Sequence, residues 1–203
     1  MKMFRGVIIG LLGVLLVVSL AGCAGTRVER VDERTIIDLS GRWNDTDSQM
    51  VADEMIVSCL EHPWRDQFVD RTGRLPVVIV GTVFNKTDEH IDPDVFIHDL
   101  ERELINRNDL RFVNAGAMRD ELRAERQSQQ EFASPATRKR LREELGADFM
   151  LQGTISKIVD MEGKKRVHFY QVDLLLADLE TTEVMWIGQK KIKKLVEKGG
   201  VGF

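Results

Sequence analysis

The last third of the chain alternates apolar and polar residues, and this alternation constrains the fold more than any other feature. Residues 149–159 and 166–178 place apolar side chains at every second position, and residues 184–192 return after a turn at 179–183. A period of two is typical of strands with one buried and one solvated face. The pattern therefore predicts neighbouring strands in a sheet that exposes one face to water.

Helical patterns and a buried strand precede this region. Apolar residues recur every three or four positions in 47–60 and 94–107, which is the spacing of an amphipathic helix. Residues 76–83 are apolar on both faces, as a central strand requires. The elements expected before residue 149 are an edge strand at 35–43, a helix at 47–60 capped by Asp45 or Thr46, a strand at 76–83, a helix at 94–107 capped by Asp92, a strand at 110–113, a helix at 117–128 with Met118 and Leu122 inward, and a helix at 135–145 ended by Gly146.

Together these elements predict a single α+β domain. Its mixed, largely antiparallel sheet should have about four strands, with the helices packed mainly on one face. The content of 43% apolar and 31% charged residues fits an ordinary globular domain. It excludes collagen-like, low-complexity and multi-span membrane proteins.

The first 22 residues have the layout of a bacterial export signal. Lys2 and Arg5 form a positive end, residues 7–20 form an apolar stretch, and small residues follow. An uncleaved membrane helix is the alternative, because this run reaches the lower limit for crossing about 30 Å of hydrocarbon. Residues 20–23 (LAGC) argue against that alternative, since they resemble the lipobox of bacterial lipoproteins.

This resemblance implies that Cys23 carries a membrane anchor. Its thiol would bear a diacylglycerol, the chain would be cut before Cys23, and the new amine would be acylated. Three acyl chains, with each buried CH₂ contributing about 0.8 kcal/mol, hold a protein on a membrane essentially permanently. By the sorting rule of such lipoproteins, Ala24 implies the outer membrane, with the domain facing the periplasm.

These signals divide the chain into four parts. We expect a signal peptide at 1–22, a lipidated tether at 23–44, the α+β domain at 45–195 and a short tail at 196–203. A tether of about 20 residues reaches at most about 70 Å when stretched. As a flexible coil it spans about 25 Å.

The sequence offers little material for catalysis or metal binding. Two histidines and two aspartates within 90–98 are close enough to consider a metal ion, but the aspartates are better explained as the start of a helix. Cys59 lies on an apolar helical stripe, which indicates a buried hydrophobe rather than a nucleophile. The motifs of acyl-transferring hydrolases and of phosphate-binding loops are missing. We therefore expect no catalytic residue, no metal, and no cofactor besides the lipid on Cys23.

The charge pattern argues against nucleic acid as a partner. The formal net charge of −4 is modestly acidic. From residue 189 onward, however, five lysines and one glutamate form a basic end. This end fits an edge strand that lysines protect from pairing, or a contact with an acidic protein face or anionic lipid head groups.

Five long runs of residues carry a resemblance to a known family. They are GRWNDTDSQMVADEMIVSCLEHPW (41–64), PVVIVGTVFNKTDEHIDPDVFIHDLERELIN (76–106), RFVNAGAMRDELRAER (111–126), GADFMLQGTI (146–155) and YQVDLLLADLETTEVMWIGQKKIKKL (170–195). The runs resemble the LpoB-type outer-membrane lipoprotein activators of penicillin-binding proteins. The resemblance implies a domain similar to the amino-terminal domain of TolB, without catalysis or a cofactor of its own. It also implies binding to a bifunctional penicillin-binding protein, whose glycan polymerisation and peptide cross-linking would be stimulated.

The short tether departs from the pattern of this family. Some members carry a long proline-rich linker, whereas no proline precedes Pro63 here. Either the periplasmic part of an inner-membrane synthase comes most of the way, or the partner lies elsewhere. A structural or assembly lipoprotein of an envelope or secretion complex is the alternative function.

Residues that contact the partner are expected on the solvated face of the sheet and at the basic end. They are Gln152, Thr154, Ser156, Gln171 and Asp173, together with Lys190, Lys191, Lys193 and Lys194. Both groups offer polar or charged side chains that no expected helix covers.

Overall fold

The computed structural model describes residues 28–32, 35–134, 136 and 144–197. Contacts within the chain divide it into two units, Met1–Thr35 and Ile36–Phe203. The described residues of the first unit lie outside helices and strands. The signal peptide expected at 1–22 and the anchor residue Cys23 fall outside the described residues.

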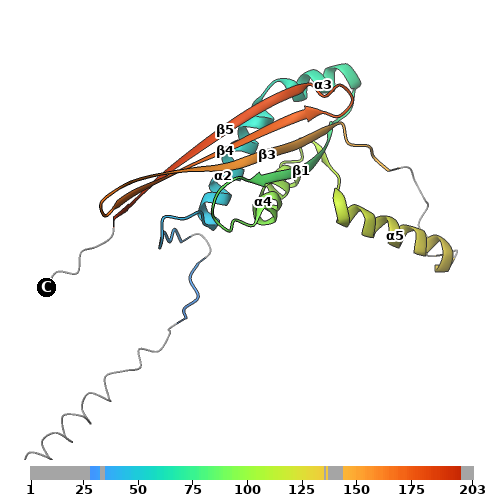
Figure 1. The fold of residues 1–203 in the computed structure, drawn as a ribbon. Coiled ribbons are helices and arrows are strands. Elements are labelled where there is room, and N and C mark those ends of the chain that lie inside the picture. The colour runs from blue at the N-terminus through green and yellow to red at the C-terminus, as the bar shows by residue number, and fades with distance from the viewer. Residues whose placement is uncertain (1–27, 33–34, 135, 137–143, 198–203) are drawn as a thin grey trace, which may run out of the picture. The chain divides into compact units, whose positions relative to one another are not determined.

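The second unit is built on a mixed sheet of five strands in the order β2-β1-β3-β4-β5 (Figure 1). The strands are β1 (Val77–Asn85), β2 (Arg111–Phe112), β3 (Phe149–Glu162), β4 (Lys165–Asp178) and β5 (Val184–Glu197). β1 is parallel to β2 and β3, whereas β4 is antiparallel to β3 and β5. The α+β class and the mixed sheet are confirmed. The count of about four strands is one too low. β2 corresponds to the strand expected at 110–113, and it pairs with β1.

The described residues form four helices, and two of them cover one face of the sheet. They are α2 (Asp45–Glu61), α3 (Trp64–Thr72), α4 (Pro93–Asn106) and α5 (Gly116–Phe132). α2 packs against α4 and β5, and α4 packs against β1 and β2 (Figure 1). α3 adds Trp64 and Phe68, whose rings lie 5.0 and 5.2 Å from the ring of Phe149. The expectation that the helices pack mainly on one face is thus confirmed.

Side-chain caps determine where α2 and α4 begin. The Asn44 side chain accepts a hydrogen bond from the Asp47 N–H (3.1 Å), and the Asp47 carboxylate accepts one from the Asn44 N–H (3.0 Å). This reciprocal pair is a capping box. Asn44, rather than Asp45 or Thr46, therefore caps α2. Asp92 caps α4 as expected, since its carboxylate accepts from the Asp94 N–H at 3.0 Å.

The segment before α2 does not form the expected edge strand. Residues 35–43 lie outside helices and strands, and they contact the domain through individual groups instead. The Gly41 carbonyl accepts a hydrogen bond from His168 Nδ1 on β4 at 2.9 Å. Gly41 has a φ of 67°, and a β-carbon there would lie 2.2 Å from Val196 Cγ2. A turn with positive φ cannot continue a regular ladder of strand hydrogen bonds, so no strand forms.

The expected inward orientation of Met118 and Leu122 is wrong. Both side chains lie on α5 and are about half exposed, at 52% and 51%. α5 buries none of its residues. The helix expected at 135–145 falls largely on residues 135 and 137–143, which lie outside the described ones.

Gly153 lies where β3 and β4 approach each other closely. A β-carbon at this position would lie 2.3 Å from the Asp173 carbonyl oxygen and 2.5 Å from Leu174 Cδ2. Overpacking of this kind typically costs 1–3 kcal/mol. We expect Gly153→Ala to lower the free energy of unfolding by about 2 kcal/mol in urea titrations. Gly146→Ala is the matched control, because nothing lies within 4 Å of its added carbon; equal midpoints for the two variants would contradict this account.

Candidate partner-binding face

The sheet has one face that α2 and α4 leave uncovered. Buried residues such as Leu151, Val172 and Trp186 point toward these helices, so the alternate positions point the other way. We call this second side of β3–β5 and its continuation on β1 the outer face. It comprises Phe84 of β1, Gln152, Thr154, Ser156 and Ile158 of β3, Val167, Phe169, Gln171, Asp173 and Leu175 of β4, and Ile187, Gln189, Lys191, Lys193 and Leu195 of β5.

Strand register brings the sequence-predicted polar residues together at the centre of the outer face. Thr154 pairs with Asp173, and Ser156 pairs with Gln171 across β3 and β4. Gln171 pairs in turn with Lys191 on β5. Residues of three consecutive strands therefore form continuous rows across the sheet.

Asp173 carries the negative charge at the centre of the outer face. Its carboxylate accepts hydrogen bonds from Gln171 Nε2 (2.8 Å) on the same strand and from Gln189 Nε2 (2.8 Å) on β5. The two amides hold the carboxylate in one orientation, so the centre of the face presents a preorganised polar surface. A partner could use it without first ordering these side chains.

Apolar side chains flank this polar centre. Ile158, Ile187 and Leu195 are 65%, 70% and 63% exposed, and Phe84 is 58% exposed. Large apolar side chains held in water beside fixed polar groups are typical of surfaces that bind another protein.

These apolar residues were not among the contact residues predicted from the sequence. Ile158 shares the two-residue period of Ser156, so the alternation already indicated that it faces outward. Phe84 could not be placed in the same way. The register of β1 shifts between Val80 and Val83, so that Val83 points to the core and Phe84 pairs with Thr154.

The structure separates the four lysines of the basic end. Lys191 and Lys193 lie on the outer face, whereas Lys190 and Lys194 lie on the side of α2. The Lys190 ammonium pairs with Glu54 of α2. Because β5 lies at the edge of the sheet, the lysines also fit the protected-edge interpretation.

Lys194 joins α2 to the segment before it. Its ammonium lies 2.6 Å from carboxylate oxygens of both Asp47 and Asp38, and its side chain is only 11% exposed. Burial opposes its charge, but the two carboxylates outweigh burial and raise the pKa of Lys194. Burial dominates at Asp47 and raises the pKa of that carboxyl. This lysine is thus already paired within the domain.

A buried carboxylate holds the long β3–β4 hairpin to the start of the domain. Glu89 accepts hydrogen bonds from Tyr170 OH (2.7 Å), Lys157 Nζ (2.7 Å) and the Trp43 N–H (3.0 Å). Lys157 and Glu89 are each only 6% exposed. The Trp43 ring adds an edge-to-face contact with Tyr170 at 5.6 Å. These contacts fix the orientation of β3 and β4, and hence of the outer face.

Cys59 has no features of a reactive thiol. It is 2% exposed in the core, and burial raises its pKa to about 12, so the thiol stays protonated at neutral pH. Within residues 28–32, 35–134, 136 and 144–197, no group of three or more His, Cys, Asp or Glu could hold a metal ion. His98 pairs with Glu101 at 2.9 Å, which raises the pKa of the imidazole.

Comparison with known proteins identifies the family. The family model of the peptidoglycan-synthase activator LpoB matches residues 47–192. This chain belongs to the LpoB family. Members activate a synthase, so the family assigns the chain to regulators rather than enzymes. The matched range includes the outer-face residues from Phe84 to Lys191.

Solved LpoB domains are similar to this chain at low sequence identity. The LpoB C-terminal domain from Escherichia coli is 17% identical and has a TM-score of 0.40, covering 73% of this chain and 99% of that chain. The domain from Salmonella enterica is 16% identical and has a TM-score of 0.34, covering 65% of this chain and 94% of that chain. No curated protein matches the chain.

The described part of this LpoB-family chain holds no helix that is long and apolar enough to cross a membrane.

Proposed function

We propose that this LpoB-family protein binds a bifunctional penicillin-binding protein through its outer face and thereby stimulates peptidoglycan synthesis. The match of the family model to residues 47–192 carries the proposal, because it assigns the chain to activators of peptidoglycan synthases. We expect the synthase to increase both its rate of glycan polymerisation and its rate of peptide cross-linking. The synthase performs the chemistry, and this chain performs none.

The composition of the outer face supports its role as the docking surface. Asp173 and its two amide partners offer fixed hydrogen-bonding groups, and apolar side chains such as Ile158 flank them. Lys191 and Lys193 add positive charge for an acidic partner surface. Lys190 and Lys194, in contrast, already pair with Glu54, Asp38 and Asp47, so we assign them to the stability of the domain.

Activation follows if the docked domain binds the active conformation of the synthase more tightly than the inactive one. The ratio of the two affinities sets the maximum shift between the conformations. A tenfold ratio corresponds to about 1.4 kcal/mol. A preorganised face suits this task, because little of its binding energy is lost in ordering side chains.

The anchor sets where this binding occurs. We propose that Cys23 carries the diacylglycerol and N-acyl lipid, which would hold the domain at the outer membrane, facing the periplasm. A tether raises the effective concentration of two membrane-bound partners only if it can span the gap between them. With about 25 Å of coil reach, the synthase must extend most of the way from the inner membrane.

The direct test adds the purified full-length chain to purified bifunctional synthases in detergent. The rate of glycan polymerisation is measured from lipid-linked precursor, and complex formation is measured by pulldown. We expect a stable complex and a faster rate with one synthase. The absence of both would contradict the proposal. Co-purification with other envelope proteins and unchanged synthase turnover would instead support a structural or assembly lipoprotein.

Cys23→Ser tests the anchor separately. Serine cannot form the thioether, so we expect the variant to lose essentially all outer-membrane attachment, either as soluble protein or as uncleaved precursor. The folded domain should persist, because its core begins after residue 23. Separation of the membranes on a sucrose gradient measures the distribution. Recovery of the variant with washed outer membranes, at the level of the unaltered protein, would contradict the lipid anchor.

A further inference from the structure

Charged side chains of opposite sign follow one another along the outer face. Asp173 of β4 lies opposite Gln189 of β5, and Lys191 and Lys193 follow Gln189 at every second position on the same side of β5. Side chains on one side of a strand are about 7 Å apart. The outer face therefore presents one negative position and then two positive positions along the direction of the strands.

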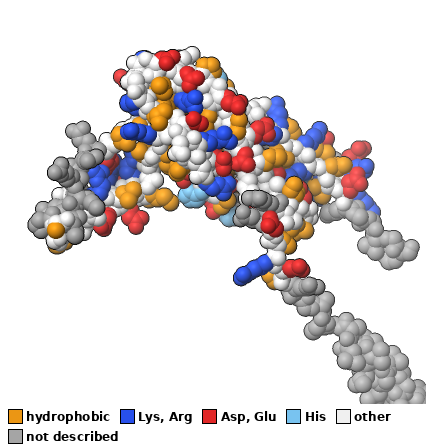
Figure 2. All heavy atoms as spheres, turned by 180° about the vertical axis from the view of Figure 1, so that it is seen from behind, with side chains coloured by type: hydrophobic (Ala, Val, Ile, Leu, Met, Phe, Trp, Pro, Cys, Tyr) orange, Lys and Arg blue, Asp and Glu red, His pale blue; other side chains and the backbone are white. Residues whose placement is uncertain are grey.

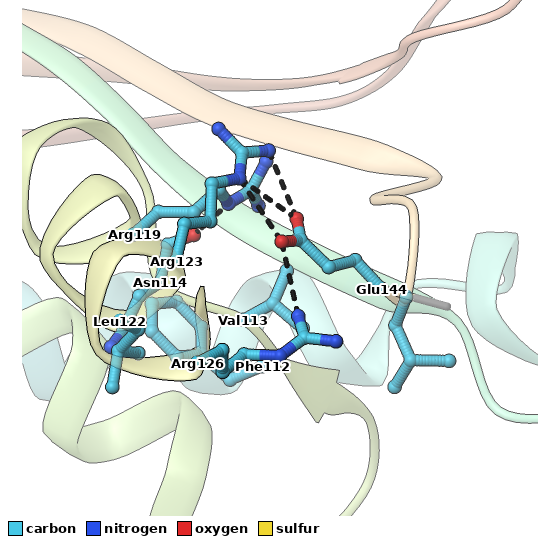
Figure 3. A pocket seen from close by; sticks show the side chains of 9 residues that line it. Phe112, Val113, Asn114, Arg119, Leu122, Arg123, Arg126 and Glu144 are labelled. Carbon is cyan, nitrogen blue, oxygen red and sulfur yellow. Dashed lines mark hydrogen bonds and ion pairs between the residues drawn. The ribbon is translucent and has the colours of Figure 1, made fainter. Parts of the chain in front are cut away.

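Asp173 differs from the carboxylates that cations hold in place. Glu144, for example, accepts hydrogen bonds from Nε and Nη2 of Arg123 at 3.0 and 2.9 Å (Figure 3). The Asp173 carboxylate accepts instead from the neutral amides of Gln171 and Gln189. Among the described residues, no Lys, Arg or His nitrogen lies within 4.0 Å of this carboxylate. Its negative charge is thus oriented but not neutralised.

The carboxylate of Asp173 is within reach of a partner. The residue is half-buried, and its hydrogen bond with Gln189 is exposed to solvent. Its Oδ2 accepts one described hydrogen bond, from Gln171 Nε2 at 2.8 Å, whereas a carboxylate oxygen can accept two. A further donor can therefore bind without displacing either amide.

Lys191 and Lys193 supply the positive half of the pattern. Both are exposed, and neither forms an ion pair with another described residue. Lys190 and Lys194, on the other side of β5, are by contrast paired with acids. Asp173 and Lys191 occupy diagonal positions on β4 and β5, and no ion pair joins these two described residues. The two signs of charge thus remain separate and available on the outer face.

We propose that Asp173 binds a cationic side chain of the synthase, an arginine or a lysine, while Lys191 and Lys193 bind acidic side chains next to it. This inference rests on the docking proposed above and adds the order of charges that the partner must present. A carboxylate that is buried in an interface without a cation loses its hydration without full compensation. A charge-assisted hydrogen bond to Asp173 supplies that compensation. A uniformly acidic partner surface would instead be repelled at Asp173.

Asp173→Asn tests the anchor with the smallest change in shape. The asparagine oxygen can still accept a hydrogen bond from Gln189, so the domain should fold, but the negative charge is lost. Calorimetric titration of the purified synthase with the full-length chain in detergent measures the affinity. We expect Asp173→Asn to bind at least tenfold more weakly. Asp70→Asn is the matched control, because it removes an exposed acid from α3, and it should bind like the unaltered chain.

Exchange of the two charges tests their order. The double variant with Asp173→Lys and Lys191→Asp keeps the net charge of the outer face and reverses the sequence of signs. We expect it to bind the synthase at least tenfold more weakly than the unaltered chain, while circular dichroism and the urea midpoint verify that it folds. A contact that depends on total charge alone would leave the affinity unchanged, and this result would overturn the proposal.

Compensating changes in the synthase identify the cation. Synthase variants selected for restored binding to Asp173→Lys should carry an acid in place of an arginine or a lysine. Restored variants that keep every arginine and lysine would overturn the proposal. If the unaltered chain binds the synthase and Asp173→Asn binds equally well, the order of charges is wrong and the docking stands. If the unaltered chain itself does not bind, the proposed docking fails, and this inference fails with it.

Discussion

Replacing Glu89 with alanine is expected to lower the free energy of unfolding by about 3 kcal/mol. The substitution removes the acceptor of the Trp43 N–H and the nearer acceptor of Tyr170 OH, which keeps only the Gly41 carbonyl at 3.5 Å. It also leaves Lys157 with only the exposed Asp88. Breaking a buried ion pair from one side typically costs 3–5 kcal/mol, because a buried charge loses its partner. Asp88 still pairs with Lys157 at 2.9 Å, so we place the loss at the low end.

Urea titration with far-ultraviolet circular dichroism measures this loss. Asp88→Ala is the matched control, because it removes the neighbouring carboxylate, which is 79% exposed and contacts the same ammonium. Solvent already screens this outer pair, so the control should unfold at nearly the unaltered midpoint. If both variants shift the urea midpoint equally, burial of the Glu89 carboxylate is not the reason for the loss of stability.

The same carboxylate makes stability depend on pH. Burial opposes the charge of Glu89, but the donors from Lys157, Tyr170 and Trp43 outweigh burial and lower its pKa from the ordinary 4.5. Its contribution is therefore complete above about pH 4.5 and is lost as the pH falls through the folded-state pKa. The urea midpoint of Glu89→Gln should fall less on acidification than that of the unaltered protein. Some dependence should remain, because Arg74 and the Val77 N–H outweigh burial and lower the pKa of Asp148.

Placing a large charged side chain at the centre of the outer face should abolish most of the stimulation of the synthase. Ser156 lies in the row with Gln171 and Lys191, so an arginine there would project into the proposed interface. Residues near the centre of an interface carry most of its binding energy. We expect Ser156→Arg to weaken synthase binding at least tenfold, which is about 1.4 kcal/mol. Stability should change little, since the position is on the solvated side of the sheet.

Matched variants separate a docking effect from a general effect of charge. Ser128→Arg introduces the same side chain on the exposed surface of α5 and should leave stimulation unchanged. Lys191→Gln should weaken binding, while Lys190→Gln should not, because these neighbouring lysines lie on opposite sides of β5. Equal effects at Lys190 and Lys191 would exclude the outer face as the docking surface.

The side of the molecule opposite to that of Figure 1 carries charges of both signs (Figure 2). Seen from the side opposite to that of Figure 1, acidic and basic side chains are interspersed, and no single sign dominates (Figure 2). Several basic groups, such as Lys190 and Lys194, are paired with acids on α2 or next to it. Interspersed charges of this kind steer partners only weakly toward that side.

Much of the fold followed from local patterns in the sequence. The two-residue period predicted β3, β4 and β5, because each strand has one face on the core and one in water. Helical spacing and the Asp92 cap predicted α2 and α4, whose apolar stripes are buried. α3 was missed, since its nine residues bury only Trp64 and Phe68, which is too little to establish a period.

The sequence by itself determined which residues are polar, where most of the strands and helices occur, and the family to which they belong. Only the tertiary structure decided which of these residues share a surface. Lys190 and Lys191 are adjacent in the chain, yet one pairs with Glu54 of α2 and the other lies on the outer face. Phe84 reaches that face only because of a bulge in β1. Local sequence encodes periodicity and caps, whereas register, bulges and the meeting of distant segments depend on packing across the whole domain.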